Sequence, residues 1–430
     1  MRDFPTLPEW VKVEHQVAEI LTRQEIHGWS FNKPAAYELE SAIRTEMEEL
    51  VRSLRSTHPF VAGAMFTPKR DNRTLGYVAG CESTRLKETN PTSRDHIAWI
   101  LTTHYGWKAS SMTATGKPVI DETVLKSIGQ AQTGSITVIS AQFLRLMELQ
   151  KLLGMISVGA NAWLKLCTTS NRIHHHCSVG CATFRASHRS PNLAQVPSDP
   201  RCRELFTASE GLQMVGADLS SIELRLMAHY LARWDGGRYR DILLNGDIHQ
   251  VNADKVGVSR SAIKTITYAF LYGCGDIRLG LSYDKSLSEK RARAKGKEIR
   301  RAYVDAIEGL SELLTAVKDA SERGFVKAID GRKILVDSKH KSLNFLLQGS
   351  SACVAKMWML LTDQTIKEQG IRASQLAFIH DELQFECAPE DVNELKFKLE
   401  TAANRAGWYY KLRVPIEAES KSGRNWSEVH

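Results

Sequence analysis

The sequence contains no apolar run long enough to cross a membrane. Of its 430 residues 43% are hydrophobic, but no stretch reaches the roughly 18 consecutive apolar residues that a spanning helix needs. The first residues, Met1-Arg2-Asp3-Phe4-Pro5, carry no apolar signal core. Internal repeats and low-complexity tracts are also missing. These absences argue against a membrane protein, a secreted protein and a repeat architecture.

The cysteines lack the dense spacing of a disulfide-stapled domain. The eight cysteines are spread over the chain, at positions 81, 167, 177, 181, 202, 274, 353 and 387. A small disulfide framework would concentrate them in a short segment. We therefore expect free thiols in a reducing compartment.

The charge balance is basic, with 57 Lys and Arg against 49 Asp and Glu, a net charge of +8 and a pI near 9.0. A basic excess suits a polyanionic partner such as nucleic acid, although many basic proteins never bind DNA. The length exceeds that of one ordinary core. It predicts two or three lobes, or one large enzyme of several subdomains.

The first half of the chain reads as mostly helical. Apolar residues recur at helical spacing through residues 11–56, with a second helix beginning near Pro34. Prolines, glycines and mixed charge in residues 57–92 predict an irregular excursion. Helical pattern returns at Ser93–Tyr105, and Ile139–Leu166 predicts one long helix interrupted at Gly154.

The second half combines strands with helices. Residues 171–220 are strand-like and rich in turns, and residues 222–234 change to a helical pattern. A mostly helical region follows to about residue 344, and it includes the basic run Lys285–Arg301. Later segments predict a helix, a hairpin and a last helix, over Ser342–Gln369, Gln375–Cys387 and about 390–406. A strand-bearing unit interrupted by a helical insertion predicts one interleaved α+β enzyme.

Asp218 follows an apolar strand and precedes a helix, in Gly216-Ala217-Asp218-Leu219-Ser220-Ser221. A carboxylate at a strand end is accessible and rigidly held, which suits a hard cation that prefers oxygen ligands. The carbonyl of Leu219 is a further candidate ligand. The alternative is an ordinary aspartate at a helix N-cap.

Asp381 lies between two apolar stretches, in Ile379-His380-Asp381-Glu382-Leu383, which predicts a hairpin with carboxylates near its tip. Charged residues at a turn are often simply solvated. Together, however, Asp218 and Asp381 provide the two rigid carboxylates that two-metal phosphoryl transfer requires.

Two cationic and two aromatic side chains follow one another at four-residue steps, namely Arg260, Lys264, Tyr268 and Tyr272. Such spacing keeps them on nearly one helix face. The cations can hold a triphosphate, and the rings can stack on a base or sugar. His249, shortly before, could donate to a phosphate. The alternatives are a solvated amphipathic face and a local structural histidine.

These segments, in this order, resemble the three polymerase motifs of family A DNA polymerases. Further segments resemble the type found in short-tailed phages, namely Glu14-His15-Gln16-Val17, Ser93-Arg94-Asp95-His96-Ile97, Pro191-Asn192-Leu193-Ala194-Gln195-Val196-Pro197, Asn245 to His249, Asp330-Gly331-Arg332-Lys333 and Asn425-Trp426. The resemblance extends over nearly the whole chain. It implies an α+β right-hand fold and template-directed extension of a DNA primer from dNTPs.

The resemblance also implies roles for individual residues at the reaction centre. Asp218 and Asp381, with the Leu219 carbonyl, would bind two Mg²⁺ ions. The primer 3′-hydroxyl then attacks the α-phosphate and pyrophosphate leaves. Arg260, Lys264 and His249 would hold the triphosphate, with Lys264 also a general acid towards pyrophosphate.

Other positions would recognise the sugar, the base and the DNA. Glu223 would reject a 2′-hydroxyl, and Tyr272 would stack near the templating base. Tyr268 stands where the 3′-hydroxyl is sensed, and a tyrosine there predicts acceptance of dideoxynucleotides. Contacts to the primer end or to the minor groove of the primer-template are implied for Arg185, Gln348 and His380. In the family a glycine commonly precedes the arginine that matches Arg185, whereas this chain has Phe184.

The resemblance implies a thumb over residues 1–165 with the 57–92 insertion, a palm over 166–230 and 345–430, and fingers over 231–344. Family relatives usually carry a 3′–5′ exonuclease domain before the polymerase, and no such segment is expected here. A separately encoded exonuclease subunit or a truncation would explain this. The 57–92 segment is shorter than the thumb insertion of the thioredoxin-recruiting relative, which argues against thioredoxin as the processivity factor.

A replicative helicase–primase is a further expected partner, and the cytoplasm of an infected bacterial host is the expected location. The basic run Lys285–Arg301 is either a template-phosphate contact or a solvated helix. Other functions remain open alternatives: an RNA polymerase or reverse transcriptase, a metal-dependent nuclease, or a catalytically weak DNA-binding replication accessory protein. The intact set Asp218, Asp381, Arg260 and Lys264 favours the polymerase.

Overall fold

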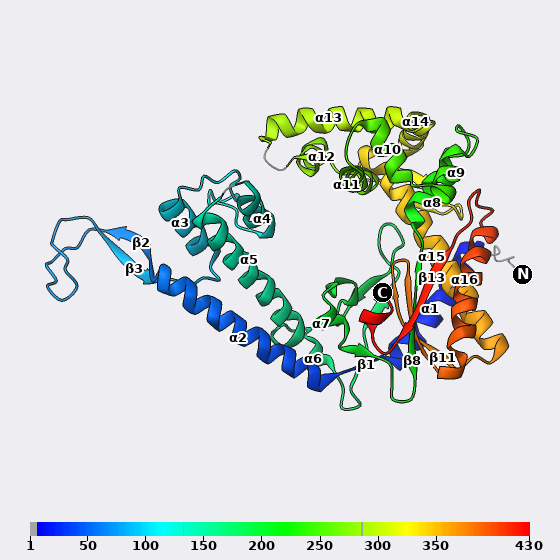
Figure 1. Ribbon diagram of the computed structural model, residues 1–430, viewed down its shortest axis with the longest axis horizontal. Helices are drawn as coiled ribbons and strands as arrows, with labels where there is room; N and C mark the ends of the chain where they lie inside the picture. The colour runs from blue at the N-terminus through cyan, green and yellow to red at the C-terminus, as the bar shows by residue number, and fades with distance from the viewer. Residues whose placement is uncertain (1–6, 132, 285–286) are drawn as a thin grey trace, which may run out of the picture. The chain divides into compact units, whose positions relative to one another are not determined.

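The computed structural model describes residues 7–131, 133–284 and 287–430, and Figure 1 shows its elements. The chain forms two compact units. The large unit joins the N-terminal segment up to Ala35 to Trp163–His430, and the small unit is Ala36–Ala162. The signal-segment prediction, on residues 1–5, and the Lys285 end of the basic run lie outside the described residues.

The small unit is mostly helical and has its own apolar core, which includes Leu54, Ile97, Phe143 and Leu146. Its elements are α2 (Lys33–Thr57), which begins in the large unit, β2 (Phe60–Phe66), β3 (Ser83–Glu88), α3 (Arg94–Tyr105), α4 (Glu122–Ala131), α5 (Ser135–Leu153) and the π-helix Gly154–Val158.

Two predictions for this unit need correction. The excursion at 57–92 is not wholly irregular, because β2 and β3 pair as an antiparallel hairpin from Phe60↔Glu88 to Phe66↔Ser83. The helix predicted over 139–166 begins earlier, widens to a π-helix at Gly154, and stops before the separate short helix α6 (Trp163–Leu166).

A four-stranded antiparallel sheet organises the large unit, in the order β11-β12-β8-β13. Its strands are β11 (Ala373–Ile379), β12 (Glu382–Cys387), β8 (Gln213–Leu219) and β13 (Ala418–Gly423). The predicted hairpin over 375–387 is confirmed, with Ile379 opposite Glu382 across its turn. The central strands β12 and β8 are buried along most of their length, which fixes their register.

Two helices pack against this sheet, α1 (Glu9–His27) and α16 (Val392–Tyr409), and α15 (Ser342–Gln369) packs against both of them. Figure 1 shows α1 and α16 beside the sheet and α15 running past them. The Trp358 indole on α15 donates to the Leu399 carbonyl of α16 at 2.8 Å. This buried bond ties α15 to α16.

The remaining elements of the large unit are short strands and a helical group. The short strands form three small sheets, from β1 (Trp29–Phe31), β4 (Arg172–Ile173) and β7 (Phe206–Thr207), from β5 (His176–Ser178) and β6 (Ser187–Arg189), and from β9 (Phe325–Lys327) and β10 (Lys333–Leu335). The helices are α7 (Pro200–Arg203), α8 (Ile222–Leu231), α9 (Arg238–Asn245), α10 (Ile248–Val256), α11 (Arg260–Leu271), α12 (Asp276–Tyr283), α13 (Glu289–Ala306) and α14 (Leu310–Ser321).

The second face of β12 is polar yet buried, which is unusual for a strand. Glu382, Gln384 and Glu386 alternate with the apolar residues and are 6%, 0% and 1% exposed. Gly216, on the neighbouring strand, makes room for this layer, because a Cβ there would lie 2.6 Å from the Gln384 side chain.

Of the helices in the described ranges, none combines the length and apolar character needed to span a membrane.

Candidate active site

The structure brings Asp218 and Asp381 to one end of the central sheet. Asp218 lies on β8 opposite Glu382, the residue after Asp381. The Leu219 backbone N–H donates to the Asp381 carbonyl at 3.0 Å, which ties the end of β8 to the hairpin tip. Helix α8 begins at Ile222 with Ser221 at its N-cap, so Asp218 is a strand residue and the N-cap alternative is wrong.

Both carboxyl groups have a raised pKa. Burial, and then the negative charge of Asp381, raise the pKa of Asp218 to about 7, although its side chain reaches solvent. Burial, and then the charge of Glu223, raise the pKa of Asp381 to about 6. Within the described residues neither group forms a salt bridge. The charge of His430 lowers the pKa of Asp218 and that of Arg185 lowers the pKa of Asp381, but neither effect outweighs burial and the neighbouring negative charges.

Glu382 has the opposite environment, although it follows Asp381 directly. It accepts from the Trp426 indole at 2.7 Å and the Gln384 amide at 2.6 Å, and it contacts His430 at 3.1 Å. Burial alone would raise the pKa of Glu382, but the contacts with His430, Trp426 and Gln384 outweigh it and lower the pKa. Glu382 thus anchors the β12 side of the hairpin tip rather than facing the site as a free ligand.

Glu223 is paired with two other sequence-predicted site residues. The Arg185 guanidinium donates to its Oε1 at 2.6 Å, and the Tyr272 hydroxyl donates to the same atom at 3.4 Å. Glu223 lies in the first turn of α8, Arg185 precedes β6, and Tyr272 caps α11. Three segments far apart in sequence therefore meet at one carboxylate.

Helix α11 places its aromatic end beside the carboxylates. The charges of Glu223 and Asp381 contribute, after burial, to a raised pKa at both Tyr268 and Tyr272. Tyr268 is half-buried, whereas Tyr272 is 48% exposed. Lys264 lies on the exposed part of the helix, about 6 Å from Tyr268 along the axis at 1.5 Å per residue.

The other end of α11 carries Arg260, which is held by Asp247 at 2.6 Å. Asp247 also caps α10, because its side chain accepts from the backbone N–H groups of His249 and Gln250. His249 Nδ1 is buried without a hydrogen-bond partner among the described residues. Burial lowers the pKa of His249, and the charges of Arg260 and Lys264 lower it further against the opposing charge of Asp247.

The remaining predicted residues lie around this centre. His380 forms the hairpin tip with a φ of 60°, and burial followed by the Arg185 charge lowers its pKa. Gln348 lies on α15 and is half-buried. Next to it, Gly349 faces Phe184 and Ile334. The structure thus brings the carboxylates, Arg185 and the α11 tyrosines together. His249, on α10, has its ring centroid 6.1 Å from that of Tyr268, while Arg260 lies at the far end of α11.

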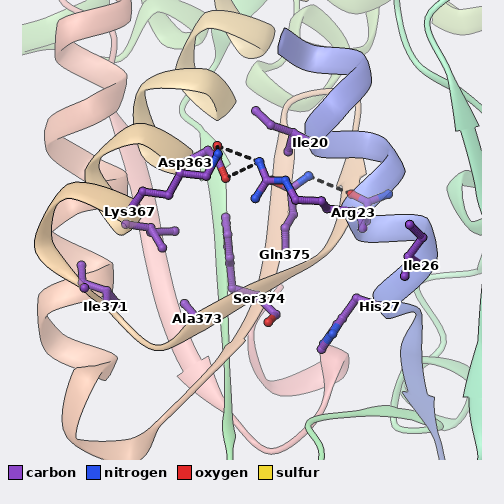
Figure 2. A pocket seen from close by; sticks show the side chains of 14 residues that line it. Ile20, Arg23, Ile26, His27, Asp363, Lys367, Ile371, Ala373, Ser374 and Gln375 are labelled. Carbon is purple, nitrogen blue, oxygen red and sulfur yellow. Dashed lines mark hydrogen bonds and ion pairs between the residues drawn. The ribbon is translucent and has the colours of Figure 1, made fainter.

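A cavity of about 550 Å³ lies elsewhere, between α1, the end of α15 and β11 (Figure 2). Its charged lining is already paired, because Arg23 and Lys367 both contact Asp363 at 2.8 and 2.9 Å. None of the sequence-predicted site residues lines it. Across the described part of the chain, no group of three or more His, Cys, Asp and Glu side chains is arranged for a metal.

Sequence reasoning missed the partners that hold the site in place. Asp247, Glu382, Trp426 and His430 each fix a predicted residue or its strand. Glu382 stood inside the His-Asp-Glu motif, so its position was visible, but its buried pairing was not. No local pattern connects residue 382 with residues 426 and 430.

The fold and this site are typical of an enzyme that acts on phosphoryl groups. An antiparallel sheet presents two unpaired carboxylates beside a helix that carries cations and tyrosines. This arrangement serves phosphoryl chemistry on a bound nucleotide.

Comparison with known proteins gives matches over nearly the whole chain. The sequence pattern of DNA polymerase family A matches residues 78–428. The DNA-directed DNA polymerases of Enterobacteria phage T3 and Escherichia phage T7 are each 31% identical to the chain, over 98% of it and 70% of their own length. A solved structure, the POL domain of Pol1 from M. smegmatis in complex with DNA primer-template and dNTP, has the same fold, with a TM-score of 0.77 at 23% identity over 97% of this chain and 70% of that one.

The chain therefore belongs to DNA polymerase family A. Its fold is the α+β polymerase fold, as the sequence predicted. The predicted enzyme class, DNA-directed DNA polymerase, is confirmed by the same relatives. Divalent metal use is general in this family.

Proposed function

We propose that this polymerase extends a DNA primer on a template by two-metal nucleotidyl transfer from dNTPs, with Asp218 and Asp381 as the metal-binding carboxylates. The observation that carries the proposal is the meeting of these two residues at one sheet end, where neither forms a salt bridge within the described residues. Two such carboxylates repel each other and are stabilised together only by added positive charge.

The residues present fit Mg²⁺. Mg²⁺ prefers carboxylate and carbonyl oxygens and usually retains several waters, so two carboxylates with the Leu219 carbonyl suffice on the protein side. Burial, and then the neighbouring negative charges, raise the pKa of each aspartate, so a bound cation would favour the ionised form of both. When bound, the ions would lower the pKa of the primer 3′-hydroxyl and neutralise the leaving pyrophosphate.

The side chains of α10 and α11 would bind and orient the triphosphate. Arg260 is exposed and oriented by Asp247, and Lys264 is exposed one turn further. Guanidinium and ammonium groups on one helix face bind adjacent phosphates. His249 would add a hydrogen bond, and Lys264 would donate a proton to pyrophosphate as it leaves.

The Glu223 cluster would set the sugar and base pocket. Glu223 lies beneath Tyr272 and would exclude a 2′-hydroxyl, while Tyr268 would face the 3′-position. Tyr272 is exposed and free to stack on a base. Arg185, Gln348 and His380 would contact the primer end and the minor groove, where hydrogen bonds report pair geometry rather than sequence.

We place the thumb in residues 1–165, the palm in 166–230 and 345–430, and the fingers in 231–344. The small unit, Ala36–Ala162, falls within the proposed thumb range. Primer-template DNA and dNTPs are the proposed partners. An exonuclease subunit, a processivity factor, for which thioredoxin is a doubtful candidate, and a helicase–primase stay predictions, as does the cytoplasm of an infected host.

A primer-extension assay tests the proposal. Asp218→Ala and Asp381→Ala should each abolish extension while DNA binding, measured by fluorescence anisotropy, is retained. Asp363→Asn is the matched control, because Asp363 is an aspartate of the large unit that pairs with Arg23 and Lys367 away from the site. Primer extension by one of the two alanine variants would refute the metal assignment of that aspartate. Primer extension by both variants would show that the reaction takes place at a different centre.

The same assay separates the alternative functions. Loss of labelled primer length would indicate a nuclease, and equal use of rNTPs and dNTPs would indicate an RNA polymerase. An accessory protein would bind DNA without extending it under any nucleotide or metal condition.

A further inference from the structure

Phe184 adopts a backbone conformation that side chains rarely tolerate. Its φ is 61°, in the left-handed region that favours glycine. The residue lies in an irregular segment before β6, where its N–H donates to the Cys181 carbonyl at 2.8 Å. A large side chain at such a position persists only where its surroundings hold it.

The ring of Phe184 is held by Arg332. The guanidinium of Arg332 contacts two aromatic rings, 4.8 Å from the Phe184 centroid and 5.1 Å from that of Trp10. Arg332 is only 5% exposed, and in this setting a cation–π contact is strong. Its side chain is fixed from the other side by Asp330 at 2.6 Å and by a short contact with Glu14.

Glu14 and Arg332 belong to a buried charged cluster that joins three elements. Glu14 on α1 also accepts from Lys356 on α15, at 2.7 and 2.9 Å. Lys356 is 1% exposed. The position of the Arg332 guanidinium is therefore determined by α1, by the turn between β9 and β10, and by the two rings.

Phe184 connects this cluster to the reaction centre. The next residue, Arg185, donates to Glu223 at 2.6 Å, and Glu223 also accepts from Tyr272. Phe184 further packs over Gly349 of α15, where an added Cβ would lie 3.8 Å from its ring. One ring thus lies between a rigid buried cation and an arginine that reaches the nucleotide pocket.

We propose that Phe184 is a positioning residue for catalysis: its ring, clamped by Arg332, fixes the segment that aims Arg185 at Glu223. The inference rests on the proposed role of Arg185 and Glu223 at the nucleotide. A glycine would relieve the backbone conformation but would leave Arg185 on a segment free to move. The chain retains a strained phenylalanine because the anchored ring restrains that motion.

The decisive experiment is a double-mutant cycle of Phe184→Gly and Arg185→Ala in steady-state extension. Phe184→Gly should lower kcat/KM for the correct dNTP by about tenfold, mostly through kcat, because misplacement of a group far from the chemistry slows the chemical step. DNA affinity should change little. The double variant should match Arg185→Ala alone, since Phe184 acts only through Arg185.

Conservative variants separate positioning from folding. Phe184→Tyr keeps the ring and should retain activity, and Phe184→Leu, which fills space without a π face, should fall between Tyr and Gly. Thermal unfolding shows whether Phe184→Gly is folded. If it is not, the comparison of Phe184→Leu with Phe184→Tyr decides, and equal kcat values for the two would overturn the proposal.

Two further outcomes distinguish this inference from the proposed function. Full activity of Arg185→Ala would refute the role of Arg185 in catalysis. A crystal structure of Phe184→Gly would then show whether Phe184 places Arg185, because loss of the Arg185–Glu223 contact would support that placement and its persistence would overturn it. If Arg185→Ala is impaired but Phe184→Gly is unaffected, or if the two losses simply multiply, Arg185 acts in the site and Phe184 does not position it.

Discussion

Replacing Asp381 by Asn should stabilise the metal-free protein while it ends DNA synthesis. Burial, and then the Glu223 charge, raise the pKa of Asp381 from 3.8 to about 6. A shift of about 2 pKa units corresponds to about 3 kcal/mol of cost to the ionised form. Asp381 is only half-buried, so solvent screening reduces the expected gain to about 1–2 kcal/mol.

The pH dependence follows from the sign of the shift. The folded-state pKa lies above the unfolded value, so ionisation of Asp381 opposes folding. This cost is complete above pH 6 and declines as the pH falls towards 3.8, where both states become protonated. The stabilisation by Asn should therefore be largest at pH 8 and should be smaller at pH 5.

Thermal unfolding in EDTA at pH 8 and pH 5 measures this effect. The gain should raise the unfolding midpoint at pH 8 by about 1–3 °C, given the entropy of unfolding of a unit this large. Mg²⁺ should raise the midpoint of the unsubstituted protein and should have less effect on Asp381→Asn, because a cation that binds only the folded state stabilises it.

Glu386 provides a control of opposite sign on the same strand. Burial alone would raise the pKa of Glu386, but hydrogen bonds from His27 and Ser209 and the charge of Arg172 outweigh it and lower the pKa to about 2. Glu386→Gln should therefore lower the midpoint at pH 8. An Asp381→Asn midpoint that is unchanged or lower at pH 8, or a gain equal at both pH values, would refute the claim that this charge is unpaired.

Two other substitutions test separate parts of the structure. Tyr268→Phe should reduce incorporation of dideoxynucleotides by about tenfold or more relative to dNTPs, because the free energy of one hydrogen bond corresponds to about that factor. Competition assays with a chain terminator measure the ratio. An unchanged ratio would show that Tyr268 does not act at the 3′-position. Glu14→Ala should lower the free energy of unfolding by about 3–5 kcal/mol, because Arg332 and Lys356 would remain buried without their shared carboxylate. Denaturant unfolding measures this change. A loss of less than about 1 kcal/mol would contradict the prediction.

The sequence was sufficient for elements that carry their own periodic pattern. Helix α15 has the predicted bounds, Ser342–Gln369, and the hairpin around His380-Asp381 forms where apolar stretches flank a short polar turn. The position of Asp218 at a strand end was also predictable, because the preceding residues are apolar and α8 begins shortly after. In each case local propensity and burial favour the same structure.

Elements whose stability depends on distant partners were not predictable. Strand β13, Ala-Glu-Ser-Lys-Ser-Gly, has little apolar character, and it is a strand because it pairs with β8. The hairpin of β2 and β3 was hidden by Pro68, Gly76 and Gly80 in its long connection and by Pro59 and Pro91 on either side of it. The Arg185–Glu223 contact joins residues 38 positions apart, and neither residue shows its partner in its local pattern.

The carboxylates at the end of the sheet differ in a way that explains their separate uses. Glu382 and Glu386, on β12, are buried, and each accepts hydrogen bonds from several donors, so each has a lowered pKa and stabilises the fold. Asp218 lies on β8 opposite Glu382, Asp381 lies in the turn before β12, and both have raised pKa values. The two glutamates receive hydrogen bonds that outweigh the effect of burial. For Asp381 a backbone hydrogen bond and the Arg185 charge, and for Asp218 the His430 charge, lower the pKa without outweighing burial and the negative neighbours. The repulsion that remains between Asp218 and Asp381 would increase the affinity of this site for added cations. This arrangement is expected for a site whose positive charge arrives with the substrate.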